Sequence, residues 1–323
     1  MFDTLSYSRR LTMTKIIESS YMTLFSPLIT IFFVILLGVF CYKKQLVNKI
    51  QIDGFELLLF KIIVPSYLFT ATYKNDLSAL LNTGYIAAYL LTFGVLTIIV
   101  TALFIKSLST ISICIKILAA SYVNSAIYAL PVITILLKDP TAAIIGNIVQ
   151  VIIIQPIFII FLNILKHKEK SLIKKILSIT TTPLIIMPII GTSLNYLQIT
   201  LPTPIVDAIS QIGSGASGIA LFAFGLTLGA TKITAQCLKF DLLSVVFAKN
   251  LIHPFIAICI AYCLNLESYW FNSLIISASA PTAFVVYLIS KQFSTEEELV
   301  KKAVALSSVV ATISLVFITM VIV

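Results

Sequence analysis

Apolar residues run along the chain in blocks of about 20, separated by short polar segments. A helix of about 20 apolar residues is long enough to cross the hydrocarbon core of a bilayer. Ten such blocks can be delimited, at 24–42, 55–73, 83–105, 111–137, 143–165, 179–197, 206–230, 241–264, 268–290 and 300–322. The pattern predicts an all-α polytopic membrane protein with ten transmembrane helices.

The fourth and ninth blocks each carry a proline near the middle. Pro131 and Pro281 lie 150 residues apart, and a proline inside a helix removes a hydrogen bond at a cost of roughly 3 kcal/mol. No water replaces that bond inside a bilayer. The flanking residues are small or polar and include Asn124, Ser125, Tyr128, Ser277, Ser279 and Thr282. We expect two broken, crossing helices, each made of two half-helices joined by an unwound segment. The alternative for each is a simple proline kink.

The blocks also repeat along the chain. The first, third and fifth reappear as the sixth, eighth and tenth, at offsets of about 155 to 158 residues. Each copy has five blocks, so the second copy enters the membrane from the opposite side, as in transporters built from inverted repeats. We therefore expect a 5+5 inverted repeat, with a polar tail over 1–23, a first repeat over 24–165, a cytoplasmic linker over 166–178 and a second repeat over 179–323.

The two breaks predict a site for an anion. Helix N-termini carry a partial positive charge and free N–H groups. Two inverted breaks that cross near the middle of the membrane direct such N-termini toward one point. That point favours an anion, typically a carboxylate. We expect Asn124, with the N–H groups before Pro131 and near Thr282, to hold it.

The charged residues are few and follow the predicted topology. Only 11% of the 323 residues are charged and 59% are hydrophobic, whereas soluble domains carry about 25% charged residues. The net charge is +9. Most lysines fall on the face reached by the odd-numbered connections, and the other face has Arg9, Arg10, Lys15, Lys74 and Lys138. Because basic residues stay cytoplasmic, we expect both termini outside. The positive charge then orients the chain in the membrane and attracts anionic membrane lipid. No nucleic-acid partner is expected.

Several polar residues lie within the predicted blocks, where an ionisable group costs at least about 2.5–3.5 kcal/mol. Lys249 and His253 are four residues apart, so they share one helix face. Both are candidates for the substrate site, with packing as the alternative. Lys61 lies closer to the end of its block, where its side chain can reach the headgroups. Gln150 either lines a cavity beside the fourth block or hydrogen-bonds a neighbouring helix.

Acidic residues are absent from the middle of every predicted block; Glu56 and Asp207 lie near block ends. Proton- and sodium-coupled carriers commonly place a carboxylate at mid-membrane depth. Coupling through a buried acid is therefore not expected. The coupling ion stays open between proton, sodium and none, with backbone carbonyls, His253 or Lys249 as alternatives to an acid.

Residues for catalysis or metal binding are sparse. The chain has two histidines and five cysteines, and the cysteines show no CxxC or zinc spacing. No paired acids, histidine cluster or nucleophile–base pair can be assembled into an enzyme site. We expect a protein that is not an enzyme and uses no cofactor or metal. A sensor or structural membrane protein remains an alternative.

Short motifs follow one another in order from about residue 24: 38–44, 65–69, 124–131, 220–228, 249–254 and 280–283. Together they resemble the auxin efflux carrier family, which includes plant auxin exporters and bacterial malate and malonate permeases. The chain departs from the family at four positions. Glycine is frequent in the family where this chain has Ala126 and Ala129, proline where it has Gly218, and asparagine where it has Thr182.

The resemblance implies a fold similar to that of bile acid–sodium symporters. Spans 1, 2, 6 and 7 form a scaffold domain in that fold, and spans 3–5 and 8–10 form a mobile transport domain. The resemblance also allows a homodimer through the scaffold. Family members carry organic anions. We therefore expect a secondary transporter of a small organic anion, of the carboxylate class, in the bacterial inner membrane, with an elevator-like alternating-access mechanism. The alternative is a sodium-coupled uptake carrier similar to bile acid symporters.

Overall fold

The computed structural model describes residues 26–74, 80–105, 109–166, 182–230 and 239–322. The predicted tail over 1–23 and nearly all of the predicted linker over 166–178 lie outside the described residues. The described part of the chain is helical and contains no strand, apart from one isolated β-bridge between Val123 and Thr282. The all-α prediction is confirmed.

The helices of the first half begin with Ser26–Lys43, which is followed by α2 (Lys49–Leu58), the π-helical segment η1 (Leu59–Ile63) and α3 (Val64–Lys74). Next come α5 (Thr83–Phe104), α6 (Thr110–Ser121), η2 (Ser125–Ala129), α7 (Leu130–Leu137), α8 (Thr141–Val149), η3 (Gln150–Ile154) and α9 (Gln155–Leu165).

The second half contains α11 (Pro183–Tyr196), α12 (Thr203–Gly213), α13 (Ala216–Ala230), α14 (Phe240–Phe247), η5 (Ala248–Ile252), α15 (His253–Cys263), α16 (Ser268–Ser279), α17 (Phe284–Gln292) and α18 (Glu297–Ile322). The predicted blocks thus fall on helices, although their ends differ by several residues.

Seven helices in the described residues are long and apolar enough to cross a membrane: Ser26–Lys43, Lys49–Lys74, Thr83–Phe104, Thr141–Leu165, Thr203–Ala230, Phe240–Cys263 and Glu297–Met320. Three shorter apolar helices are Thr110–Ser121, Ser125–Leu137 and Pro183–Tyr196. These helices support an integral membrane protein. The number of ten crossings stays a prediction.

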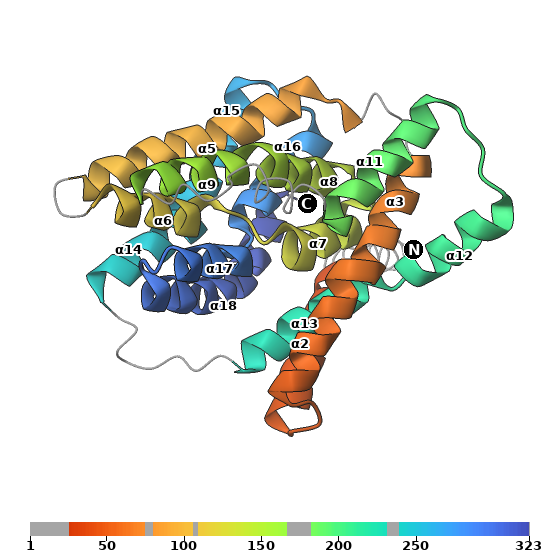
Figure 1. The fold of residues 1–323 in the computed structure, drawn as a ribbon, viewed down its shortest axis with the longest axis horizontal. Helices are drawn as coiled ribbons and strands as arrows, with labels where there is room; N and C mark the ends of the chain where they lie inside the picture. The colour runs from red at the N-terminus through yellow and green to blue at the C-terminus, as the bar shows by residue number, and fades with distance from the viewer. Residues whose placement is uncertain (1–25, 75–79, 106–108, 167–181, 231–238, 323) are drawn as a thin grey trace, which may run out of the picture.

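The helices fall into two groups that lie side by side (Figure 1). The first group contains Ser26–Lys43, α2, α3 and α11–α13, and its helices approach one another closely at glycines. A Cβ atom added to Gly225 on α13 would overlap the carbonyl oxygen of Ile35, and one added to Gly191 on α11 would overlap that of Phe69. Small residues allow membrane helices to touch backbone to backbone. This group is therefore tightly joined.

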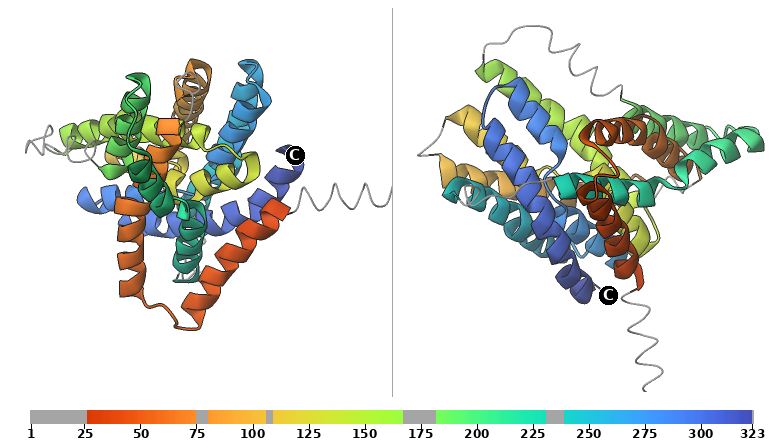
Figure 2. Two further views of the ribbon diagram at one scale, coloured as in Figure 1. Left: turned by 90° about the vertical axis from the view of Figure 1, so that its right-hand side faces the viewer. Right: turned by 90° about the horizontal axis from the view of Figure 1, so that it is seen from below.

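The second group contains α5, α6, α9 and α14–α18, which share one apolar core. In the view from below, the blue helices of this group lie apart from the green α11 and α12 of the first (Figure 2). The Lys116 side chain on α6 is fully buried; it pairs with Asp241 on α14 at 2.9 Å and lies 4.4 Å from the centre of the Phe104 ring. The ion pair with Asp241 explains why this lysine can be buried.

We predict that Gly225→Ala destabilises the protein, because the new methyl group would collide with the Ile35 carbonyl and overpacking costs about 1–3 kcal/mol. Gly94→Ala on α5 is the matched control, since a Cβ there meets nothing within 4 Å. Thermal unfolding of the purified protein in detergent should show a lower Tm for the first variant alone. Equal Tm values for both variants would contradict the close packing at Gly225.

Candidate functional site

Two interruptions of the helices cross each other, one between α6 and η2 and the other between α16 and α17. The N–H of Asn124 donates to the Pro281 carbonyl at 2.9 Å, and the N–H of Ala283 donates to the Tyr122 carbonyl at 3.2 Å. Backbone groups inside a membrane that lack a helical partner must find another one. Here each interruption supplies partners for the other.

The two prolines take different positions relative to these interruptions. Pro281 lies within the second one, whereas Pro131 lies in the first turn of α7, beyond η2. Because η2 and α7 form one continuous helix, Ser125–Leu137, Pro131 lies inside that helix, and the π-helical segment η2 comes directly before it. The unwound segment is therefore residues 122–124, before Pro131. Tyr128 lies between this unwound segment and Pro131, and its hydroxyl donates to the Ala311 carbonyl at 3.0 Å.

Gln150 holds the first interruption from the adjoining segment η3. Its Oε1 accepts from the N–H of Val123 at 2.6 Å, and its Nε2 donates to the Val123 carbonyl at 3.2 Å and to the Ser125 hydroxyl. The Gln150 side chain is buried. Its side-chain amide therefore pairs with buried backbone that has left the helix, which is the hydrogen-bonding alternative stated for it above.

The hydroxyl groups of the second interruption, and of α16 before it, form hydrogen bonds to other groups of the protein. The N–H of Thr282 donates to Ser307 Oγ at 3.1 Å, and Thr282 Oγ1 donates to the Ala119 carbonyl at 2.6 Å. Ser279 bonds to a carbonyl of its own helix, and Ser277 shares a hydrogen bond with a tyrosine of α5. These hydroxyls join α16 and the second interruption to neighbouring helices.

Lys249 and His253 lie together, as their spacing predicts, with Lys249 Nζ 3.0 Å from His253 Nδ1. Lys249 Nζ also donates to the carbonyl of Ala278 at 3.2 Å, and the Lys249 side chain is fully buried. Ala278 lies in the last turn of α16, where carbonyl groups carry a partial negative charge. Lys249 therefore caps the half-helix that leads into the second interruption.

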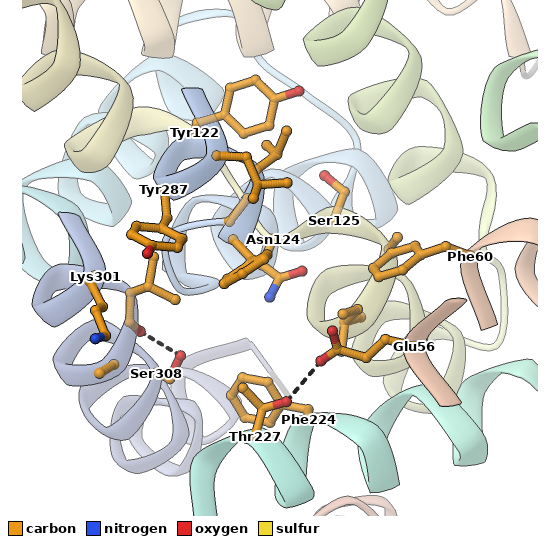
Figure 3. A pocket seen from close by; sticks show the side chains of 18 of the residues that line it. Glu56, Phe60, Tyr122, Asn124, Ser125, Phe224, Thr227, Tyr287, Lys301 and Ser308 are labelled. Atoms are coloured by element: carbon orange, nitrogen blue, oxygen red, sulfur yellow. Dashed lines mark hydrogen bonds between the residues drawn. The ribbon is translucent and has the colours of Figure 1, made fainter. Parts of the chain in front are cut away.

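A cavity of about 920 Å³ lies beside the crossing (Figure 3). α2, η1 and α13 form one wall, and the first interruption, α17 and α18 form the other. Among the predicted site residues, Asn124 and Ser125 line it. The others lie around it without lining it: Tyr128, Pro131, Gln150, Lys249, His253, Ser277, Ser279, Pro281 and Thr282.

The wall at the crossing presents groups that donate hydrogen bonds. The side-chain amide of Asn124 has no hydrogen-bond partner among the described residues and points into the cavity. The helix Ser125–Leu137 and α17 both begin at this wall, and neither has a side chain capping its N-terminus. The first turn of a helix leaves free N–H groups. Residues of both first turns line the cavity: Ala126, Ile127, Phe284 and Val285.

The opposite wall presents a carboxylate. Glu56 on α2 is half-buried and lines the cavity, and its Oε1 accepts a hydrogen bond from Thr227 Oγ1 on α13 at 2.9 Å. Sequence reasoning had placed Glu56 near the end of a block that starts at 55, but α2 begins at Lys49. Asn48 and Gln51 form a capping box there, and this Asn-x-x-Gln pattern is the signal that could have extended the helix.

Comparison with known proteins gives a consistent picture. The family described as "Membrane transport protein" matches residues 23–319. The uncharacterized transporter YfdV of Escherichia coli (strain K12) is 24% identical over 287 residues, which cover 83% of this chain and 87% of the relative. A putative malonate transporter of Rhizobium meliloti (strain 1021) is 26% identical over 136 residues, 41% of this chain and 42% of that protein. The auxin efflux carrier component 8 of Arabidopsis thaliana is 25% identical over 111 residues, 34% of this chain and 30% of that protein.

We predict that Gln150→Leu destabilises the protein by about 1–3 kcal/mol, because the buried N–H of Val123 loses its side-chain partner. The Val123 carbonyl still accepts a hydrogen bond from the N–H of Ser125. Gln211→Leu, on the exposed face of α12, is the matched control and should leave Tm unchanged. A Tm for Gln150→Leu equal to that of the control would show that other groups satisfy this backbone.

We also predict that Lys249→Met lowers Tm, because the Ala278 carbonyl loses its partner at a cost of about 1–3 kcal/mol. The exposed Lys61→Met is the matched control. Thermal unfolding and ligand titration should be measured on both. Weaker ligand binding at an unchanged Tm would instead support a direct role of Lys249 in attracting the ligand.

Proposed function

Because the chain belongs to the membrane transport protein family, of which auxin efflux carriers are members, we propose that it is a secondary transporter of a small organic anion of the carboxylate class. The family consists of membrane transporters and not of enzymes. A relative named as a putative malonate transporter supports a carboxylate as the substrate.

The observation that carries this proposal is the donor wall of the cavity. It combines the unpartnered amide of Asn124 with the N-termini of Ser125–Leu137 and α17. A helix N-terminus favours an anion through its free N–H groups and its dipole. Two such termini beside one amide suit a carboxylate group, which has two oxygens to accept hydrogen bonds.

The arrangement of the helices supports an elevator-like movement. In the proposal, the chain crosses the membrane ten times as a 5+5 inverted repeat whose two broken helices, α6 with η2–α7 and α16 with α17, cross at the site. The first group of helices forms the scaffold, joined by its glycine contacts and available for a homodimer. The second group, with the crossing, forms the transport domain. The cavity lies between the two, so its shape changes when one group slides against the other.

The basic residues of the cavity lining fit an inward-open carrier. Lining residues close in sequence to the connections 44–48 and 293–296 include Tyr42, Lys49, Lys301 and Lys302. In the proposed topology these odd-numbered connections face the cytoplasm of a bacterium, because basic residues stay on that side of the inner membrane. The lysines also attract an anion from solution toward the cavity.

We predict that Asn124→Ala abolishes carboxylate transport without unfolding the protein, since the Asn124 amide bonds to no other described residue. A hydrogen bond to a charged group is worth about 1.5–3 kcal/mol, so affinity should fall at least tenfold. The test is a thermal-shift screen against malonate, malate, acetate and indole-3-acetate, followed by flux into proteoliposomes.

Asn163→Ala on α9 is the control for that experiment, because Asn163 lies outside the cavity and bonds to a carbonyl of its own helix. It should retain transport. Flux through Asn124→Ala at the parental rate would show that the donor wall is not the substrate site.

A further inference from the structure

The cavity proposed to bind a carboxylate contains a carboxylate of its own. In Figure 3 the Asn124 amide and the Glu56 carboxylate point into the same space from different elements. Glu56 lies two helical turns beyond the start of α2 and is half-buried between Phe60 and the α13 residues Phe224 and Thr227. An anion held at Asn124 therefore shares an enclosed space with Glu56.

The nearest cations do not neutralise Glu56. The Thr227 hydroxyl is the partner that α13 provides. The ionisable groups that line the cavity with Glu56 are Lys49 and Asp53 on α2, Tyr42 on the preceding helix, Tyr122 at the crossing, Tyr287 on α17, and Glu298, Lys301 and Lys302 on α18. The lysines lie in the first two turns of α2 and α18. Among the described residues, Glu56 forms no ion pair with any of them.

Two negative charges in such a space repel each other strongly. At 4 Å the repulsion between unit charges is about 1 kcal/mol in water and about 4 kcal/mol near a protein surface. Two carboxylates that share one site cannot both be ionised without this cost, and one of them takes up a proton. A single carboxylate is sufficient to bind a proton. The described residues hold no cluster of three or more His, Cys, Asp or Glu side chains that could hold a metal ion.

We propose that Glu56 is a proton-binding site whose protonation accompanies binding of the organic anion in this cavity. The inference rests on the proposed function. The Glu56 carboxylate takes one proton from water on the side to which the cavity opens, and the neutral acid then faces the anion. Because binding linkage is reciprocal, protons strengthen anion binding by the same factor as the anion strengthens proton binding.

The location of Glu56 decides where that proton goes. Glu56 belongs to α2 in the first group of helices, whereas Asn124 belongs to the crossing. When the crossing carries the anion away, Glu56 stays behind, ionises again and returns its proton to the side from which it came. The proton therefore sets the affinity of one face of the carrier without being transported. Glu56 therefore does not couple transport to the movement of protons across the membrane.

The experiment is a titration of the purified protein with malonate between pH 6.5 and 8.5, together with the same titration of Glu56→Gln. The dissociation constant of the native protein should rise with pH, by up to tenfold per unit if one proton is bound with each anion. The variant should bind malonate with an affinity that does not change with pH. Glu267→Gln, an exposed residue just before α16, is the matched control and should behave like the native protein.

A second variant keeps the test valid if Glu56→Gln does not fold. In Thr227→Val the ionised carboxylate loses a hydrogen bond that stabilises it. Glu56 should then keep its proton to a higher pH, so tight binding of malonate should extend to a higher pH than in the native protein. Tm values for all variants report whether they fold.

Flux measurements in proteoliposomes with a fluorescent pH indicator complete the test. Acidification on the cavity side alone should strengthen malonate binding, with no net proton movement in step with malonate. Affinity that does not vary with pH in the native protein, or pH dependence that persists in Glu56→Gln, would overturn the inference. So would proton transport in step with malonate, or preferential binding of an amine that depends on Glu56. If no carboxylate of the panel binds at any pH, the proposed function itself fails.

Discussion

Every interruption of a helix inside a membrane frees N–H and carbonyl groups that water cannot reach. In this protein two interruptions meet and satisfy each other, through Asn124 with Pro281 and through Tyr122 with Ala283. Gln150 completes the pairing from the adjoining helix. Among the described residues, the first turns of the resuming helices and the Asn124 amide keep donors without a partner, and these face the cavity. The donors of the site are thus what remains after the backbone has been satisfied.

The cavity has two walls of opposite character. The wall at the crossing offers N–H groups, while the wall on α2 and α13 offers the Glu56 carboxylate and its Thr227 partner. The walls belong to different groups of helices. The first group is joined through glycines such as Gly225, and the second is joined by an apolar core and the buried pair of Lys116 and Asp241. A site between two separately joined bodies changes its shape when they move.

Sequence patterns predicted the helices well, because a block of about 20 apolar residues has few other stable forms in a membrane. They predicted the crossing less well: Pro131 marked the right block but lies beyond the interruption, inside the continuous helix Ser125–Leu137. Asn124, which the sequence singled out as a candidate, lies in the interruption itself and lines the cavity. The roles of Gln150 and Lys116 depend on partners far along the chain, Val123 and Asp241, and no local pattern reveals such contacts.

The assignment of the two walls to different groups of helices has a consequence for compounds that block the protein. In the proposed mechanism a substrate needs only the donor wall, so it would travel with the crossing. An elongated molecule with an anionic end for the Asn124 wall and a cationic end for Glu56 would hold both walls at once and tie the two groups of helices together. Such a molecule would bind and stop the carrier. The length of the compound and the separation of its two charges would then distinguish an inhibitor from a substrate. The affinity of either end alone would matter less.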